Sequence, residues 1–286
     1  MRKSLAKVPS RFFLHAVILG LVVIWLLPTL GVLITSFRSP QAINASGWWM
    51  VFSKPFDFTQ YTLANYQNVI SQQGLGRAFL NSVLIAFPAT VFPILIASFG
   101  AYAFAWMRFP MRNFLFMLMV GMLVVPLQVT FIPILKIYNF LHLSGSFPGI
   151  WIAHTAYGLP LTLYLMHNFI AGLPRDLFDS AAIDGASPLR SFFSIVIPLS
   201  VPAIAAVAIF QFLWVWNDLL VALIYLGGSP NVAPLTLTIA NLVGSRGQAW
   251  WLLTAAAFLS MALPLVIFFS LQRYFVRGIL AGSVKG

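Results

Sequence analysis

The sequence contains no cysteine and few charged residues. Without cysteine, disulfides, thiolate metal sites and cysteine nucleophiles are excluded. Only 7% of the 286 residues are charged and only five of them are acidic, whereas a soluble domain carries about 25% charged residues. The chain is 60% hydrophobic with a mean hydropathy of +0.93. Because so few charges cannot cover a water-exposed surface, the chain is predicted to lie largely in lipid.

Motifs for nucleotide binding and catalysis are also missing. There is no G-x-x-x-x-G-K-[ST] loop to hold ATP phosphates. His15, His142, His154 and His167 are scattered without metal-ligand spacing, and no nucleophile–base pair stands out. These observations argue against a membrane-bound enzyme, and no cofactor or metal is expected on this chain.

The net charge of +11 can indicate a nucleic-acid partner. The basic residues, however, lie in short clusters between apolar runs, which is typical of a membrane topology signal. No nucleic acid is therefore expected.

Six segments are apolar over the roughly 20 residues that a membrane span needs. They are residues 12–36, 77–106, 113–136, 148–170, 193–224 and 250–274. The basic amino terminus resembles a signal peptide, but its apolar run from Phe12 to Ile34 exceeds the 7–15 residues of a secretory core. It is interpreted as a retained first span.

Basic residues set the predicted orientation. With the amino terminus in the cytoplasm, eleven lysines and arginines fall on inner segments and five on outer ones, as the positive-inside rule requires. The predicted organisation is a cytoplasmic amino terminus (1–11), span 1 (12–36), an outer loop (37–76), a five-span core (77–274) and a cytoplasmic carboxyl terminus (275–286). Within the core lie an inner loop (173–192) and a long outer loop (225–249). Prolines inside the spans predict bent helices.

The inner loop has the features of two short helices joined at a corner. Pro174 suits the first helical position and Asp176 the positive end of the helix dipole. Gly185 can adopt the left-handed conformation that stops a helix. Ser187 and Pro188 then start a second helix that runs into the fifth span. The sequence predicts a stiff elbow joined to a membrane helix, which either lies on the lipid headgroups or docks another protein.

The residues "DSAAIDGASPLRSFFSIVIPLSVP" resemble the cytoplasmic "EAA" loop of permease subunits in ATP-binding-cassette (ABC) importers. In that family the pattern is E-A-A-x-I-D-G-A followed by L-P-L, and the loop sits in a groove of the ATPase subunit. Two positions depart from it, since Asp179 replaces glutamate and Ser180 replaces alanine. The resemblance implies an ATPase-coupling role for Asp179, Ser180, Ala181, Ala182, Ile183, Asp184, Gly185 and Ala186.

Further segments, "YGLPLTLYLMHNFI" and "FQFLWVWNDLLVALIYL", resemble the second, six-span permease of maltose-type carbohydrate importers. The implied fold is an all-α, six-span importer permease bundle with a cytoplasmic coupling helix, in a bacterial inner membrane. The implied partners are a homologous permease, two ATPase subunits carrying ATP and Mg²⁺, an extracytoplasmic sugar-binding protein and a sugar. In the family, the outer loop after span five enters the binding protein, which implies that role for residues 226–248.

A sugar path requires amides or carboxylates beside aromatic faces. Gln211, Trp214 and Asp218 follow helical spacing and are predicted to share one face of span five. The full set of path candidates is Gln211, Trp214, Asn217, Asp218, Gln128 and Tyr157, with Asn81 and Asn168 as further polar residues near spans. The alternative is structural, since Asn and Gln bridge membrane helices. Tryptophan anchors interfaces, and Trp216 is expected at the outer one.

The leading hypothesis is the permease of an ATP-driven sugar importer with a di- or oligosaccharide or α-glucoside-like substrate. The alternative is a stand-alone ion-coupled transporter. Such a transporter needs carboxylates or broken-helix ion sites near the membrane midplane. Asp218 is the one acidic residue in the outer half of a predicted span. Lys136 and Arg77 are its candidate ion-pair partners.

Overall fold

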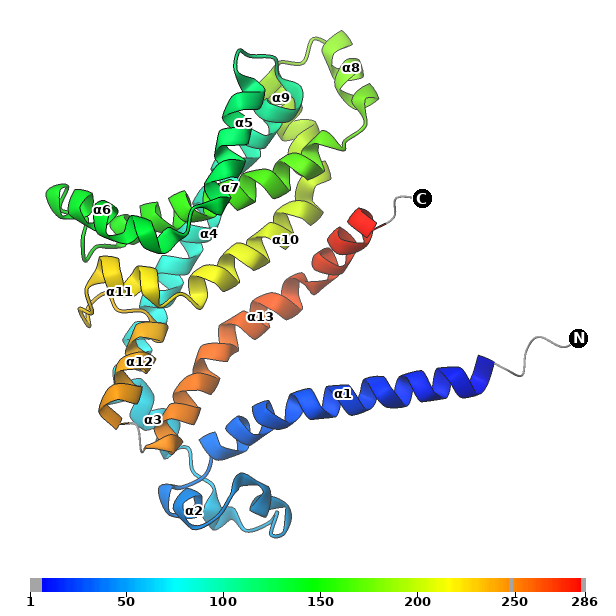
Figure 1. Cartoon of the computed structure of the whole chain (residues 1–286). Coiled ribbons are helices and arrows are strands. Elements are labelled where there is room, and N and C mark those ends of the chain that lie inside the picture. Colours follow the sequence, from blue (N-terminus) through cyan, green and yellow to red (C-terminus); the bar gives the residue numbers. More distant parts are fainter. Residues whose placement is uncertain (1–6, 247–248, 284–286) are drawn as a thin grey trace, which may run out of the picture. The chain divides into compact units, whose positions relative to one another are not determined.

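The computed structural model describes residues 7–246 and 249–283, with side chains over 11–243 and 249–272. Across these ranges the chain is helical, with one isolated antiparallel bridge between Arg38 and Tyr61. The all-α class is therefore confirmed (Figure 1). The α-helices are α1 (Lys7–Ser36), α2 (Pro40–Ala45), α3 (Ala64–Ser71), α4 (Leu75–Trp106), α5 (Arg112–Gly121), α6 (Leu127–Phe140), α7 (Phe147–Ala171), α8 (Arg175–Ile183), α9 (Pro188–Ser191), α10 (Ile197–Trp216), α11 (Leu220–Leu226), α12 (Leu235–Arg246) and α13 (Trp250–Ser283). Short 3₁₀ turns lie at Trp48–Phe52, Phe58–Gln60 and Met122–Val124, and a π-turn at Phe192–Val196.

Four helices in the described residues are long and apolar enough to cross a membrane. They are Arg11–Ser36, Leu75–Trp106, Pro188–Trp216 and Trp250–Gln272, which correspond to four of the six predicted spans. The predicted span 113–136 is a pair of helices bent by 102° that counts as a fifth if the pair is one span. The sixth segment is α7, which has 25 residues but falls outside this set because histidines, threonines and Asn168 interrupt its apolar run.

Two predicted spans differ from the helices that form. The bend in the third occurs where Val125 leaves the helix and Pro126, which lacks an N–H, precedes α6. The helix of the fifth ends at Trp216, and a separate helix, α11, follows a break at Asn217–Leu219. A continuous fifth span over 193–224 was therefore wrong, because the Asn–Asp pair caps helix ends in place of continuing one.

The chain forms two compact units, Met1–Gly76 with Ile239–Met261 and Arg77–Thr238 with Ala262–Gly286. In the first, the outer segment 37–76 is ordered around Arg38, which is 2% exposed. Its guanidinium donates to Ala42 O at 2.7 Å and Ser46 O at 2.8 Å, and Asn65 Nδ2 donates to the carbonyls of Ser36 and Arg38. Thus one buried cation satisfies the carbonyls at the end of α2.

The second unit is built on α4, α7 and α10. Small residues of α4, Ala97 and Ala101, are fully buried, so the three helices approach closely around Leu163, Met166 and Val196. Large apolar side chains such as Phe87 remain exposed on the outside, as expected for a lipid-facing surface. Within this unit α5, α8 and α9 lie at one end and α6 and α11 at the other (Figure 1).

Side chains of neighbouring helices take up the carbonyls that two prolines of α4 leave free. A proline at position i removes the hydrogen bond to the carbonyl at i−4. The carbonyl left free by Pro88 is that of Leu84, and it accepts from Trp151 Nε1 at 2.8 Å. The carbonyl left free by Pro93 is that of Ala89, and it accepts from Gln211 Nε2 at 3.1 Å. Each of these carbonyls of α4 therefore has a donor from α7 or α10.

Candidate functional site

The elbow predicted at 173–192 is present, and backbone capping makes it stiff. Gly185 has φ +71°, the left-handed conformation that glycine adopts without strain. The N–H of Gly185 donates to Ala182 O at 3.1 Å and the N–H of Ala186 to Ala181 O at 2.9 Å. These two bonds form a Schellman motif, which satisfies carbonyls at the end of α8. The alanines and glycine of this loop are thus the residues that close the corner.

The second helix of the elbow begins as predicted. Ser187 Oγ accepts from the N–H of Arg190 at 3.3 Å, and Pro188 occupies the first helical position. From there the helix continues to Trp216, with a π-turn at Phe192–Val196 just before Pro198. The π-turn absorbs the missing N–H of Pro198 without breaking the helix. The helix that follows the corner is therefore an unbroken rod from Pro188 to Trp216.

One side of α8 packs against α4 of the second unit. Phe178 stacks on Trp106 with ring centroids 3.9 Å apart, and Trp106 Nε1 donates to Ile170 O at 3.0 Å. Ile170 lies in the last turn of α7, and its carbonyl also accepts from the N–H of Leu173 at 3.2 Å. Phe178 is therefore turned toward α4, whereas Leu177 is exposed.

The other side of α8 is open. Ile183 is 87% exposed, and most coupling candidates are exposed, with Ala181 and Ala186 half-buried. Arg175 Nε and Asp179 Oδ2 form an exposed ion pair at 3.5 Å. The exposed residues are Asp179, Ser180, Ala182, Ile183, Asp184 and Gly185. An exposed isoleucine beside small residues is suited to a protein partner.

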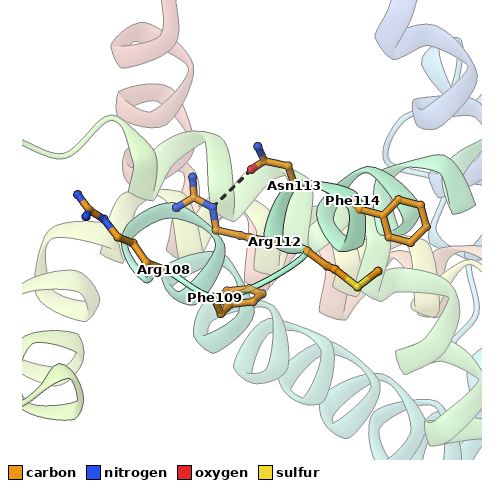
Figure 2. Close-up of a pocket in the computed structure, with 6 residues that line it drawn as sticks. Arg108, Phe109, Arg112, Asn113 and Phe114 are labelled. Atoms are coloured by element: carbon orange, nitrogen blue, oxygen red, sulfur yellow. Dashed lines mark hydrogen bonds between the residues drawn. The ribbon is translucent and has the colours of Figure 1, made fainter.

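A basic hollow lies beside the elbow. At the turn from α4 to α5, Arg108, Arg112 and Asn113 line a hollow of about 420 Å³ (Figure 2). Arg112 Nη1 donates to Met107 O at 3.0 Å, and the turn passes through Met111 at φ 59°. The same two arginines also line a second hollow of about 490 Å³ whose far wall is α8. The end of this unit that carries the elbow is therefore positively charged.

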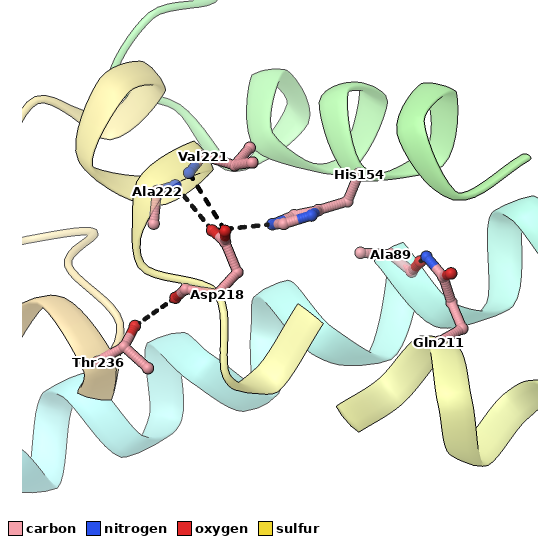
Figure 3. A network of polar contacts seen from close by, with 7 residues as sticks. All are labelled: Ala89, His154, Gln211, Asp218, Val221, Ala222 and Thr236. Carbon is pink, nitrogen blue, oxygen red and sulfur yellow. Dashed lines mark hydrogen bonds and ion pairs between the residues drawn. The ribbon is translucent and has the colours of Figure 1, made fainter. Parts of the chain in front are cut away.

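The opposite end of the same rod carries a polar corner at Asn217–Leu219. Asp218 accepts from the N–H groups of Val221 at 3.2 Å and Ala222 at 2.9 Å (Figure 3). The carboxylate thus caps the start of α11. Its Oδ2 also lies 3.8 Å from His154 Nε2, and His154 is 1% exposed. The pairs with Lys136 or Arg77 that were considered for Asp218 are not formed.

The three residues predicted to share a face of span five all point toward α7. Gln211 lies against Gly158, where an added Cβ would overlap its amide, and it is only 6% exposed. The ring of Trp214 meets that of His154 edge-on at 5.3 Å, one helical turn from Gly158. Gln211 and Trp214 thus share a face of α10, packed against α7 at Gln211, whereas Asp218 lies beyond the end of the helix.

The other path candidates are separated from this face. Asn217 Nδ2 donates to Leu213 O at 2.8 Å, at the end of its own helix. Tyr157 OH lies 2.7 Å from both Thr130 Oγ1 and Tyr225 OH, so it joins α6, α7 and α11. Gln128 is exposed on α6. Asn168 is exposed on α7.

Two tryptophans make contacts that were not predicted from the sequence. Trp216 is buried, stacked on Phe212 at 5.4 Å and edge-on to Phe79 at 5.7 Å, so it packs inside the protein, and its position near the outer interface stays a prediction. Trp151 donates to a carbonyl that a proline leaves free, a role that was not predicted. The signal was present, because an indole N–H inside a membrane protein needs an acceptor.

Comparison with known proteins identifies the family. Residues 89–281 match the family described as "binding-protein-dependent transport system inner membrane component". The chain belongs to this family. As a permease of a binding-protein-dependent ABC importer, it is a multi-pass inner-membrane protein and not itself catalytic.

Two curated relatives of this permease are similar over most of its length. The osmoprotective compounds uptake permease protein GgtD of Synechocystis sp. is 60% identical over 95% of this chain and 91% of the relative. The alpha-glucoside transport system permease protein AglG of Rhizobium meliloti is 52% identical over 87% of this chain and 67% of the relative. Both alignments extend over the elbow and the corner.

A solved structure supports the fold of the permease. A chain of a bacterial ABC transporter that imports the acidic polysaccharide alginate aligns with a TM-score of 0.78 at 18% identity. The alignment covers 96% of this permease and 100% of the alginate transporter chain. The importer-permease fold inferred from the elbow is therefore confirmed.

Proposed function

We propose that this chain is the membrane permease of an ATP-driven importer of α-glucoside-like sugars and related osmoprotective compounds. The elbow is the observation that supports coupling to an ATPase. It is exposed, its two short helices are capped where they meet, and the second helix is continuous with α10. The substrate class rests on the two relatives at 52% and 60% identity, whose names refer to alpha-glucosides and osmoprotective compounds.

The mechanism follows from the stiffness of the elbow. Two ATPase subunits bind and hydrolyse ATP in the cytoplasm, and one of them grips the open side of α8. When the ATPases close, α8 moves, and the rod from Pro188 to Trp216 moves with it because only the capped corner at 184–187 separates them. A homologous second permease moves in the same way, so the path between the two opens outward to receive sugar.

The outer face receives sugar from an extracytoplasmic binding protein, which we place on the loop over 226–248. Both chain termini are then cytoplasmic, in agreement with the distribution of basic residues. The ATP-coupling role covers the exposed elbow residues 179–186.

For the sugar path, the hydroxyl chain offers the most suitable chemistry. Tyr157 and Thr130, both half-buried, join hydroxyls and an aromatic face, and the buried Tyr225 hydroxyl completes the chain. Gln128 is exposed two residues before Thr130 on the same helix. Trp214, Asn217 and Asp218 remain path candidates at the corner. The contacts of Gln211 with Ala89 and Gly158 favour helix packing for that residue.

The alternative of a stand-alone ion-coupled transporter lacks a site in the described part of the chain. Both carboxylate oxygens of Asp218 accept from the backbone of α11, and no group of three or more metal-ligating side chains occurs there. Family membership argues against this alternative as well.

Transport by the reconstituted complex tests the proposal. Vesicles containing the permease, its partner permease, the ATPases and the binding protein are expected to accumulate radiolabelled trehalose or sucrose only when ATP is enclosed with the ATPases. A β-linked disaccharide such as diacetylchitobiose serves as the control substrate. Accumulation by the permease alone under an ion gradient would refute the proposal, and preference for the β-linked sugar would refute the substrate class.

A further inference from the structure

The start of the outer loop is attached to α4 by two buried polar residues. Asn81 Nδ2 donates to Asn231 O at 3.1 Å and to Ala233 O at 3.0 Å. Ser82 Oγ accepts from the N–H of Leu235 at 2.8 Å. Asn81 and Ser82 are 5% and 3% exposed. A side chain of α4 therefore caps the first N–H of α12, and a second one holds the turn before it.

A third bond joins the same loop to the polar corner. Thr236 Oγ1 donates to the carbonyl of Asp218 at 2.5 Å (Figure 3). The side chain of Asp218 caps α11. Asp218 therefore accepts a hydrogen bond from the loop at its backbone carbonyl and caps a helix with its carboxylate. The outer loop and the corner cannot move separately without breaking this bond.

The buried apolar residues of the loop reinforce these contacts. Ala233, Leu235 and Leu237 are each below 5% exposed, which places the beginning of the predicted partner-docking stretch inside the unit. Opening this segment would expose apolar surface and leave the carbonyls and N–H held by Asn81 and Ser82 unpaired. The segment 229–238 is therefore a fixed part of the membrane unit.

The corner lies at the far end of the rod that begins at the elbow. Helix runs from Pro188 to Trp216, the corner follows directly, and Thr236 reaches it from the outer loop. A displacement of the loop is thus delivered to the end of the helix whose other end the ATPase grips. This arrangement connects two docking surfaces through one helix and one hydrogen bond.

We propose that Thr236 is a positioning residue, supported by Asn81 and Ser82, that couples docking of the binding protein to the outer end of α10. The inference rests on the proposed function. Without this bond the binding protein still docks, but docking no longer shifts the corner, and the ATPase receives a weaker signal. The effect falls on turnover and not on docking affinity.

The chain offers a matched control. Thr238 stands two residues further on, is half-buried like Thr236, and donates to Pro234 O at 3.0 Å within its own segment. Thr236→Val and Thr238→Val each replace a hydroxyl by a methyl group at nearly constant volume. Only the first removes a bond to the corner.

The assay is a titration of ATP hydrolysis by the reconstituted complex with sugar-loaded binding protein. Thr236→Val is expected to lower the maximal stimulated rate about five- to tenfold, as loss of one buried hydrogen bond permits. The half-saturating concentration of binding protein and the unstimulated rate should change less than about twofold. Thr238→Val should behave as wild type, and Thr236→Ser should restore stimulation.

Two results overturn the inference. One is a Thr236→Val titration that matches that of Thr238→Val. The other is a rise in half-saturating concentration at unchanged maximal rate, which would make Thr236 a docking contact. If Thr236→Val does not assemble, Ser82→Ala is titrated in its place and must show the same loss of maximal rate. A wild-type complex that binding protein does not stimulate would instead remove the proposed function, together with the inference.

Discussion

The elbow and the polar corner stand at the two ends of one helix and are stabilised in different ways. At the elbow, every capping bond joins residues that are at most five apart, such as Ala186 and Ala181. At the corner, Asp218 caps α11 locally, but further bonds reach across the chain, from Thr236 to Asp218 and, in the adjoining loop, from Leu235 to Ser82. A surface that must fit a partner keeps its own shape through local bonds, whereas the corner depends on its neighbours and responds to them.

The largest expected effect concerns the elbow. Gly185→Val forces a β-branched residue to φ +71°, which opposes the left-handed corner by about 1–2 kcal/mol or more. Sugar uptake should fall about tenfold or more while ATP hydrolysis and membrane insertion persist. Gly185→Asn, which tolerates this conformation, is the control. Wild-type uptake by the valine variant would show that the corner does not transmit force.

Between the two ends, Gln211→Leu tests whether the face toward α7 packs or transports. The substitution leaves Ala89 O without its donor in a buried site, which should destabilise the permease by about 1–3 kcal/mol. A thermal unfolding scan of the purified complex should show a lower midpoint, with an unchanged KM for sugar. A raised KM at unchanged stability would return Gln211 to the sugar path.

At the corner, Asp218→Ala removes the cap of α11. Loss of a helix cap costs about 0.5–2 kcal/mol, so the unfolding midpoint should fall, and uptake should fall with it. Asp218→Asn is expected to have a smaller effect on both, because asparagine also caps helices but offers one acceptor oxygen where the carboxylate uses two. If the asparagine variant assembles normally but loses uptake, the negative charge itself acts on the substrate.

The smallest effect is expected at Tyr157. Tyr157→Phe removes the hydroxyl that lies 2.7 Å from Thr130 Oγ1 and from Tyr225 OH, and keeps the ring. If this hydroxyl meets the sugar, KM should rise about three- to tenfold, as loss of one neutral hydrogen bond predicts. An unchanged KM together with a lower unfolding midpoint would assign the hydroxyl to helix packing alone.

The difference between the two ends also explains what the sequence could predict. The elbow was predicted nearly residue by residue, since Pro174, Gly185 and Ser187 act on their immediate neighbours. The break at Asn217–Leu219 was missed, because the apolar residues on either side of it read as one span. Asp218 followed by four apolar residues was the available capping signal.

Contacts across the chain were not predictable in the same way. His154 has no sequence feature that pairs it with Asp218, and nothing near Asn81 or Ser82 points to residues 231–235. Such bonds depend on how α4, α7 and α10 cross, which a single sequence does not encode locally. The buried position of Trp216 was missed for the same reason, since its place depends on Phe79 of another helix.

The carbonyls that prolines leave free and that side chains of other helices take up limit how this permease can change in sequence. At Pro93 and Gln211, and at Pro88 and Trp151, one residue frees an acceptor and the other supplies the donor. Replacing Gln211 alone by an apolar residue leaves the carbonyl of Ala89 unpaired in a buried site, whereas replacing Pro93 by alanine as well restores a backbone N–H for it. Substitutions that succeed should therefore arrive in pairs, on residues more than sixty positions apart in the chain.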